Sequence, residues 1–238
     1  MKKNLLNAGL LIAATILAKD MAAQGDAGNN NPAPKTYFYD SLTRGGYTLT
    51  VDDQSPDFDT AVKRRLVEAY FNVYPKEAAL YNPRTVKSVR FWIDPLYEGV
   101  AEAGGNTVRF NPNWFKKKPG DIDVVTHEVM HLVQNYPGWS GPGWITEGIA
   151  DYVRHTMGID NAGADWSLPD YKTDHSYENA YRITARFFVW IENKKKKGLV
   201  KKLDGLMRAG KYKPSFWKIE TGKTVDELWK EYAANPAI

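Results

Sequence analysis

The chain has 238 residues, which is enough to bury a core and is about the size of one domain. It contains no cysteine, so disulfide bonds and a cysteine-linked lipid anchor are excluded. Apolar residues make up 43% and charged residues 25%, as in ordinary soluble globular proteins, and the formal net charge is +4. Short lysine clusters at 116–118 and 194–197 are interpreted as solvated faces, because no nucleic-acid-binding motif accompanies them.

The N-terminus has the layout of a secretory signal peptide. Its first three residues carry positive charge, residues 5–18 are mostly apolar, and small residues follow at 21–23. The apolar stretch is too short to span a bilayer, and a buried N-terminal helix is the alternative interpretation. We therefore expect residues 1–23 to be a signal peptide and residues 24–35, rich in Gly, Asn, Ala and Pro, to be a flexible leader. Residues 36–238 are expected to form a single domain outside the cytoplasm, either secreted or periplasmic.

The residue pattern of this domain predicts a few strands followed by several helices. Strands are predicted over 47–51, 86–93 and 107–110, and small residues predict a loop over 99–105. A helix is expected to begin at Ser55-Pro56 and to be interrupted at Pro75. Later helices are predicted over 121–135, 144–157, 177–193, 199–207 and 225–234, the last one with a capping box of Thr224 and Glu227. This order is typical of an α+β fold with a small early sheet and a mostly helical C-terminal part.

The motif His127-Glu128-Val129-Met130-His131 lies within the predicted helix 121–135. Since residues i and i+4 share one face of a helix, the two imidazoles can point at one ion. Glu128 lies about 100° round the helix from His127, so its carboxylate can reach a water on that ion without being a ligand. Hydrolytic zinc sites use three protein ligands and keep one position open for water. The motif therefore supplies the first part of such a site, including its catalytic glutamate.

A third ligand has to come from elsewhere in the chain. A histidine six residues past His131, preceded by a glycine, is excluded because Gln134 and Pro137 stand at those positions. Glu147 fits instead, since it lies sixteen residues past His131, in the next predicted helix and after a turn rich in glycine and proline. Asp151 is one helical turn beyond Glu147, and we expect it to accept the spare N–H of a ligating histidine, which we assign to His127. Helical carboxylates usually face water, so both assignments depend on the histidine motif.

The two remaining histidines, His155 and His175, are expected to be structural or solvent-exposed. His175 has an alternative interpretation as a hydrogen-bond donor to an oxyanion.

Three segments together resemble the plant basic secretory protein family. They are the motif at 127–131, the segment Trp144 to Arg154 and the segment Tyr181 to Phe188, and residues 108–112 and 121–126 are similar too. The resemblance extends from Tyr37 to the C-terminus, and the chain has the character of a bacterial relative. It implies a zincin-like peptidase domain.

The resemblance also implies roles for individual residues. The zinc ligands would be His127, His131 and Glu147, and Glu128 would be catalytic. Tyr181 is implied as a further active-site residue, with a buried structural tyrosine as the alternative.

These features predict a secreted zinc metallopeptidase that hydrolyses protein or peptide substrates with a zinc-activated water and Glu128 as general base. Tyr181 or His175 would stabilise the oxyanion. The resemblance to zinc peptidases further suggests that the strand 107–110 is a sheet edge that pairs with an extended substrate. No nucleic acid, membrane anchor or particular oligomeric state is indicated.

The alternative hypothesis is a non-catalytic extracytoplasmic module that binds glycan or peptide around a structural metal. Structural zinc sites usually have four protein ligands, and the sequence offers no credible fourth one.

Overall fold

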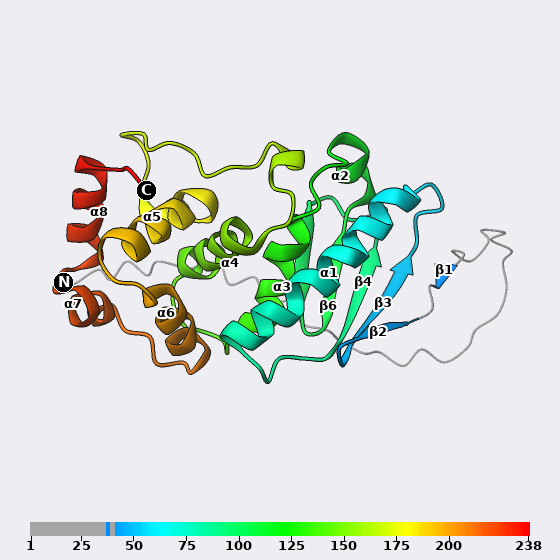
Figure 1. The fold of residues 1–238 in the computed structure, drawn as a ribbon, viewed down its shortest axis with the longest axis horizontal. Coiled ribbons are helices and arrows are strands. Elements are labelled where there is room, and N and C mark those ends of the chain that lie inside the picture. Colours follow the sequence, from blue (N-terminus) through cyan, green and yellow to red (C-terminus); the bar gives the residue numbers. More distant parts are fainter. Residues whose placement is uncertain (1–36, 39–40) are drawn as a thin grey trace, which may run out of the picture. The chain divides into compact units, whose positions relative to one another are not determined.

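The computed structural model describes residues 37–38 and 41–238, so the predicted signal peptide (1–23) and leader (24–35) lie outside the described residues. One sheet is formed by strands β1 (Tyr37–Phe38), β2 (Leu42–Arg44), β3 (Tyr47–Asp53), β4 (Ser88–Ile93), β5 (Ala101–Gly104) and β6 (Thr107–Phe110). The α-helices are α1 (Thr60–Tyr81), α2 (Pro112–Lys117), α3 (Val124–Gln134), α4 (Gly143–Met157), α5 (Tyr181–Lys194), α6 (Leu199–Arg208), α7 (Ser215–Thr221) and α8 (Val225–Ala234). Figure 1 shows this α+β arrangement, which confirms the predicted fold class. Within the described ranges no helix is both long and apolar enough to cross a membrane.

The strand order is β1-β3-β4-β6-β5, and β2 also pairs with β3. Strands β3, β4 and β6 are parallel, whereas β5 is antiparallel to β6. The prediction of a loop over 99–105 and of an edge strand at 107–110 is therefore wrong, because β5 lies outside β6 and forms the edge. The side chains of β5 are small or charged and at most half-buried, so the segment lacks the apolar alternation that would have predicted a strand.

Helix α1 begins later than predicted and continues through Pro75. Its first turn is capped by Asp59, whose carboxylate accepts hydrogen bonds from the backbone N–H groups of Ala61 and Val62. A proline inside a helix costs about 3 kcal/mol because it removes one hydrogen bond and crowds the preceding turn. Here the helix stays intact because the face that carries Tyr70 and Tyr74 is completely buried on the sheet.

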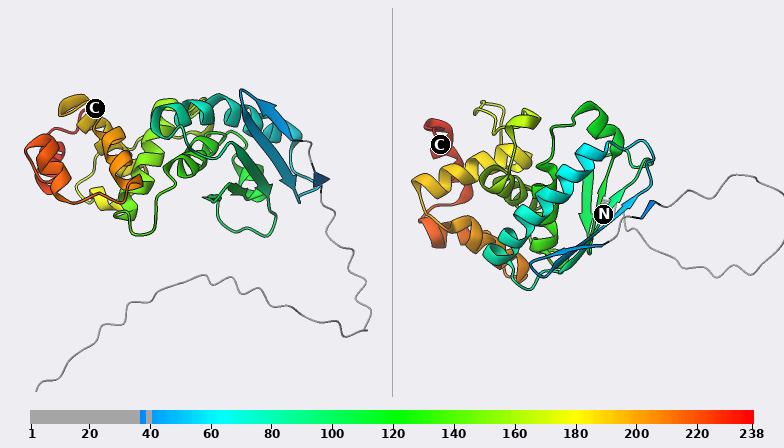
Figure 2. Two further views of the ribbon diagram at one scale, coloured as in Figure 1. Left: turned by 90° about the horizontal axis from the view of Figure 1, so that it is seen from below. Right: turned by 45° about the vertical axis from the view of Figure 1, so that its right-hand side comes forward.

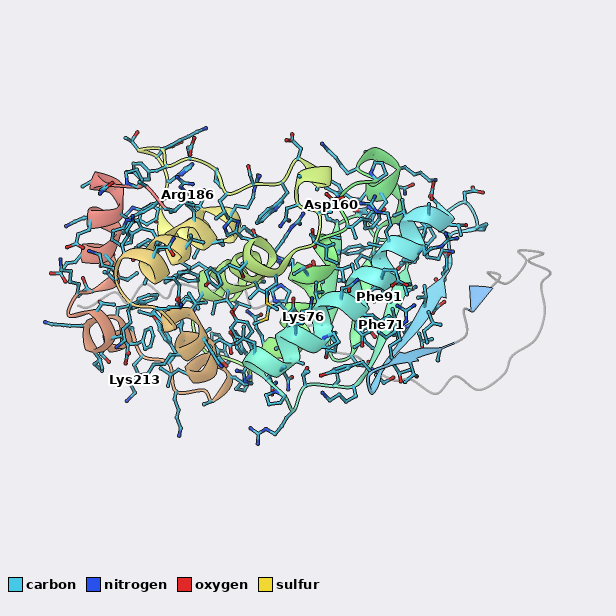
Figure 3. All side chains as sticks on the ribbon, viewed as in Figure 1. Phe71, Lys76, Phe91, Asp160, Arg186 and Lys213 are labelled. Carbon is cyan, nitrogen blue, oxygen red and sulfur yellow. The ribbon has the colours of Figure 1, made fainter. Side chains whose placement is uncertain are left out.

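The core between α1 and the sheet is rich in aromatic side chains. Phe91 of β4 contacts Tyr70 of α1 edge to face, with ring centroids 5.6 Å apart, and it contacts Phe110 of β6 at 5.0 Å. Figure 3 shows the side chains that fill this layer, with Phe91 labelled. Such edge-to-face pairs add to the free energy that burial alone provides, and they fix how α1 lies on the strands.

Helix α3 lies between the sheet and α4, and α5 follows on the far side of α4 (Figures 1 and 2). Ten of the eleven residues of α3 are buried, as expected for a helix that passes through the centre of a domain. Helices α4 and α5 approach closely at Gly148, where an added Cβ would lie 2.8 Å from the Cβ of Thr184. This close approach places the first turn of α5 against the N-terminal half of α4.

The predicted helix 177–193 is interrupted near its start. A short 3₁₀ turn, η2 (Tyr177–Asn179), comes first, and α5 begins only at Tyr181. Between them Ala180 (φ +62°) and Tyr181 (φ +49°) both have left-handed backbone conformations. Neither residue is a glycine, so nothing in the local sequence indicates the break.

The helices predicted over 121–135, 144–157, 199–207 and 225–234 are confirmed to within a few residues as α3, α4, α6 and α8. The capping box of Thr224 and Glu227 is present at the start of α8. The short helices α2 and α7 were not predicted.

Candidate metal centre

Two imidazoles and one carboxylate converge where α3 and α4 lie side by side. The Nε2 atoms of His127 and His131 are 3.1 Å apart. The Oε2 atom of Glu147 lies 3.2 Å from Nε2 of His127 and 3.5 Å from Nε2 of His131. In the described part of the chain this is the group of His, Cys, Asp and Glu side chains whose geometry could hold a metal ion.

The three separations fit a tetrahedral zinc ion. Zinc bonds of about 2.0–2.1 Å at tetrahedral angles place neighbouring ligand atoms about 3.3 Å apart. The distances of 3.1, 3.2 and 3.5 Å surround this value. Lone pairs that meet this closely repel one another unless a cation or a proton lies among them, so the geometry itself calls for positive charge.

The same repulsion is visible in the proton affinities of the metal-free site. Burial disfavours the imidazolium form of His127, but hydrogen bonds to Asp151 and Glu147 outweigh burial and raise the pKa of His127 to about 10. Burial alone would raise the pKa of Glu147, yet hydrogen bonds from the two histidines lower it to about 2. Both shifts favour positive charge at the centre, so a metal ion would bind there in competition with a proton.

Hydrogen bonds on the outer side of each imidazole fix which nitrogen faces the centre. Nδ1 of His127 donates to Oδ1 of Asp151 at 2.7 Å, which is the contact expected from the position of Asp151 one turn beyond Glu147. Nδ1 of His131 donates to Oε1 of Gln134 at 2.7 Å, and the amide of Gln134 is oriented in turn by donating to the carbonyl of Thr146 at 2.9 Å. With both Nδ1 atoms protonated, both Nε2 atoms keep a free lone pair for a metal ion.

Gln134 was missed as a supporting residue by the sequence analysis. Gln134 was noted only because it stands where another zinc motif requires a glycine. It lies three residues past His131 on the same helix and could have been found by that spacing.

Glu128 is buried to 94% and lines the cleft beside the histidines without being one of the three converging groups. Burial raises the pKa of Glu128, and the neighbouring His127 and His131 counteract this effect. A carboxylate with a raised pKa is a better proton acceptor than an ordinary glutamate.

The centre opens into a cleft of about 980 Å³. The edge strand β5 contributes Ala101, Glu102 and Ala103 to the lining of this cleft. The edge strand beside the site is therefore β5 and not the strand 107–110 that was predicted. An open edge next to the metal-binding atoms leaves backbone groups available for pairing with an extended chain.

Tyr181 also lines the cleft, and its ring stacks on His127 with centroids 6.0 Å apart. It is 53% exposed, so the alternative of a buried structural tyrosine is wrong. Partial desolvation of its hydroxyl and the nearby charge of Glu147 raise the pKa of Tyr181, which keeps the phenol protonated as a hydrogen-bond donor. His155 is exposed and His175 is half-buried, and neither lines the cleft. The structure therefore brings Tyr181 to the site and leaves His175 away from it.

Comparison with known proteins supports a peptidase. The family described as "Peptidase of plants and bacteria" (BSP) matches residues 47–232. No curated protein matches the sequence.

Several solved structures are similar to part of this chain. The M1 zinc metallopeptidase from Deinococcus radiodurans is 11% identical with a TM-score of 0.49, and the match covers 86% of this chain and 52% of that one. A mutant of this enzyme with a Tyr-Ser-Ala substrate is 13% identical with a TM-score of 0.47, covering 86% and 53%. A mutant two-domain M1 zinc metallopeptidase with L-tryptophan is 13% identical with a TM-score of 0.46, covering 86% and 52%. The present chain thus spans about half the length of these structures.

Proposed function

The chain belongs to the family of peptidases of plants and bacteria, as its motifs predicted, and we propose that it is a zinc-dependent peptidase that acts outside the cytoplasm. The observation that carries this proposal is the convergence of His127, His131 and Glu147 at separations that suit one tetrahedral ion. Their imidazoles are held by Asp151 and Gln134 in the tautomers that a metal ion requires.

The residues of the cleft divide the chemistry among them. Zinc at this centre would act as a Lewis acid toward the scissile carbonyl and lower the pKa of a water molecule. Glu128 accepts the proton of the attacking water and passes it to the leaving amine. Tyr181 donates its phenolic hydrogen to the oxygen on which negative charge develops. The backbone of β5 holds the substrate in an extended conformation along the cleft.

The proposed location outside the cytoplasm is supported by the N-terminal sequence alone. The predicted signal peptide at residues 1–23 would direct the chain across the cytoplasmic membrane.

A binding module with a structural metal is less consistent with this site. Structural zinc is usually enclosed by four protein ligands, whereas the described residues provide three that meet. The side chains of His131 and Glu147 keep 16% and 28% of their surface exposed toward an open cleft. Such an open position is needed by a hydrolase and is a disadvantage for a structural site.

The proposal is tested by metal analysis and peptide digestion of two variants. Glu128→Ala should retain zinc but lose activity about 10²- to 10⁴-fold, because it removes the general base and leaves the ligands in place. His131→Ala should lose zinc and activity together. Glu178→Ala is the matched control, since Glu178 is exposed and does not line the cleft.

Wild-type hydrolysis should stop with a chelator and return with zinc. Cleavage at the normal rate by Glu128→Ala would refute the role of the base, and full zinc occupancy in His131→Ala would refute the ligand assignment.

A further inference from the structure

Two tryptophans line the cleft beyond the N-terminal end of α3, and a buried ion pair connects them. Trp114 donates its indole N–H to Oδ2 of Asp121 at 2.9 Å. Arg154 donates to the other carboxylate oxygen, Oδ1, at 2.5 Å. The guanidinium of Arg154 also lies over the ring of Trp166, 4.6 Å from its centroid. We call these four residues the tryptophan cluster.

The charges of the tryptophan cluster are used within the protein. Asp121 and Arg154 are 7% and 5% exposed, and each oxygen of Asp121 already accepts a hydrogen bond. Arg154 also donates to Asn161 at 3.1 Å. A buried ion pair with its hydrogen bonds satisfied offers little to a ligand, but it holds its neighbours in fixed positions. What the cluster presents to the cleft is therefore the two half-buried indole rings, oriented by the charges beneath them.

The cluster lies within reach of a bound substrate. Arg154 follows Glu147 by seven residues on α4, which places the two on nearly the same face of the helix and about 10 Å apart along its axis. An extended peptide rises about 3.3 Å per residue. A substrate held at the metal centre would therefore pass the tryptophan cluster about three residues from the bond that is cleaved. A substrate side chain that points toward the cluster can reach it from a residue closer to that bond.

We propose that the tryptophan cluster is a specificity subsite that accepts an aromatic side chain of the substrate, a proposal that rests on the peptidase function above. Indole rings held at fixed angles stack well on another aromatic ring. A cationic side chain is disfavoured, because one face of Trp166 already carries the guanidinium of Arg154. The charged residues Lys118, Asp165 and Arg182 also line the cleft, so it carries charges of both signs.

A pair of peptides that differ only by Phe or Ala tests the subsite. A library digest with the zinc-loaded wild type first identifies the position at which aromatic residues are preferred. Trp166→Ala should then lower the ratio of kcat/KM for the Phe peptide over the Ala peptide about tenfold or more. Trp166→Phe should keep most of this ratio. Trp139→Ala is the matched control, because Trp139 is 96% exposed and does not line the cleft, and it should leave both the ratio and the activity unchanged.

A wild type without any aromatic preference would overturn the proposal, and so would an unchanged ratio in Trp166→Ala. If the zinc-loaded protein cleaves no peptide at all, the proposed function fails and the subsite is tested by equilibrium binding of the same two peptides. Tighter binding of the Phe peptide that is lost in Trp166→Ala would then support the subsite alone, and equal binding of both peptides would overturn it.

Discussion

Substitution of Asp151 by Asn should weaken zinc binding by a predictable amount. The carboxylate of Asp151 and the imidazole of His127 are both at least nine-tenths buried. They are joined by a hydrogen bond of 2.7 Å. Hydrogen bonds to charged groups contribute about 1.5–3 kcal/mol, and loss of such an outer partner typically lowers metal affinity about 10- to 100-fold. We expect Asp151→Asn to raise the Kd for zinc by this factor.

Gln134→Ala provides an internal scale for this prediction. It removes the corresponding partner of His131, but the lost hydrogen bond is between neutral groups and contributes only about 0.5–1.5 kcal/mol. Its effect on the Kd should therefore be smaller, about 2- to 10-fold.

The effect of Asp151→Asn should also depend on pH. The pKa of His127 is raised to about 10 in the metal-free protein, partly by Asp151, so zinc competes with a proton at neutral pH. Removing Asp151 also lowers the affinity of His127 for this proton, which partly offsets the loss of zinc affinity at low pH. The ratio of the variant's Kd to the wild-type Kd should therefore increase between pH 6.5 and 8.5.

Both Kd values are measured by competition with a chromophoric zinc chelator, and circular dichroism verifies that the variants are folded. Asp226→Asn is the control, since this carboxylate accepts a similar hydrogen bond of 2.7 Å from Tyr177 but does not line the cleft. A folded Asp151→Asn protein whose Kd stays within threefold of the wild type, with a ratio that does not increase from pH 6.5 to 8.5, would refute the reasoning.

Three further predictions concern stability and are measured by urea unfolding. Gly148→Ala should destabilise the fold by about 1–3 kcal/mol, because the new methyl group would crowd Thr184. Gly205→Ala is the control and should stabilise the fold by about 0.5–1 kcal/mol, because Gly205 lies in an open helical position. Equal effects of the two substitutions would contradict the close packing of α4 and α5. Glu77→Leu should stabilise the protein by about 1–3 kcal/mol at neutral pH, because the Glu77 carboxyl is fully buried without a hydrogen-bond partner. Burial raises the pKa of Glu77 well above 4.5, so the free energy of unfolding of the wild type should fall as pH rises above 4.5. The stability gained in Glu77→Leu should therefore grow from pH 5 to 8. A stability gain that is independent of pH would contradict this account. Ala180→Gly should stabilise the fold by about 1 kcal/mol, because Ala180 adopts φ +62° and ψ −170°, a region open mainly to glycine, and a loss of stability would show that the strain is absent.

Much of the candidate centre could be predicted because helix geometry converts sequence spacing into position. His127 and His131 share a face in any α-helix, and the same rule places Asp151 one turn from Glu147. Gln134 follows the same rule and would have been found by it. The turn between α3 and α4 is rich in glycine and proline, which made a return of the chain toward the histidines predictable.

Backbone features that oppose local preference were not predictable. Pro75 remains inside α1 because burial on the sheet outweighs its cost, and the sequence around it contains no indication of that surface. The left-handed conformations of Ala180 and Tyr181 are likewise not indicated by the sequence, because neither residue is a glycine.

The sequence by itself determined most of the helices, the family and the residues that can bind a metal, because helical periodicity and motif spacing can be read along the chain. Only the tertiary structure decided that β5 forms the edge beside the centre, and that Trp114 and Trp166 meet around Asp121 and Arg154. The physical reason is that pairing between strands and side chains distant in sequence depends on the packing of the whole domain, which local spacing does not specify.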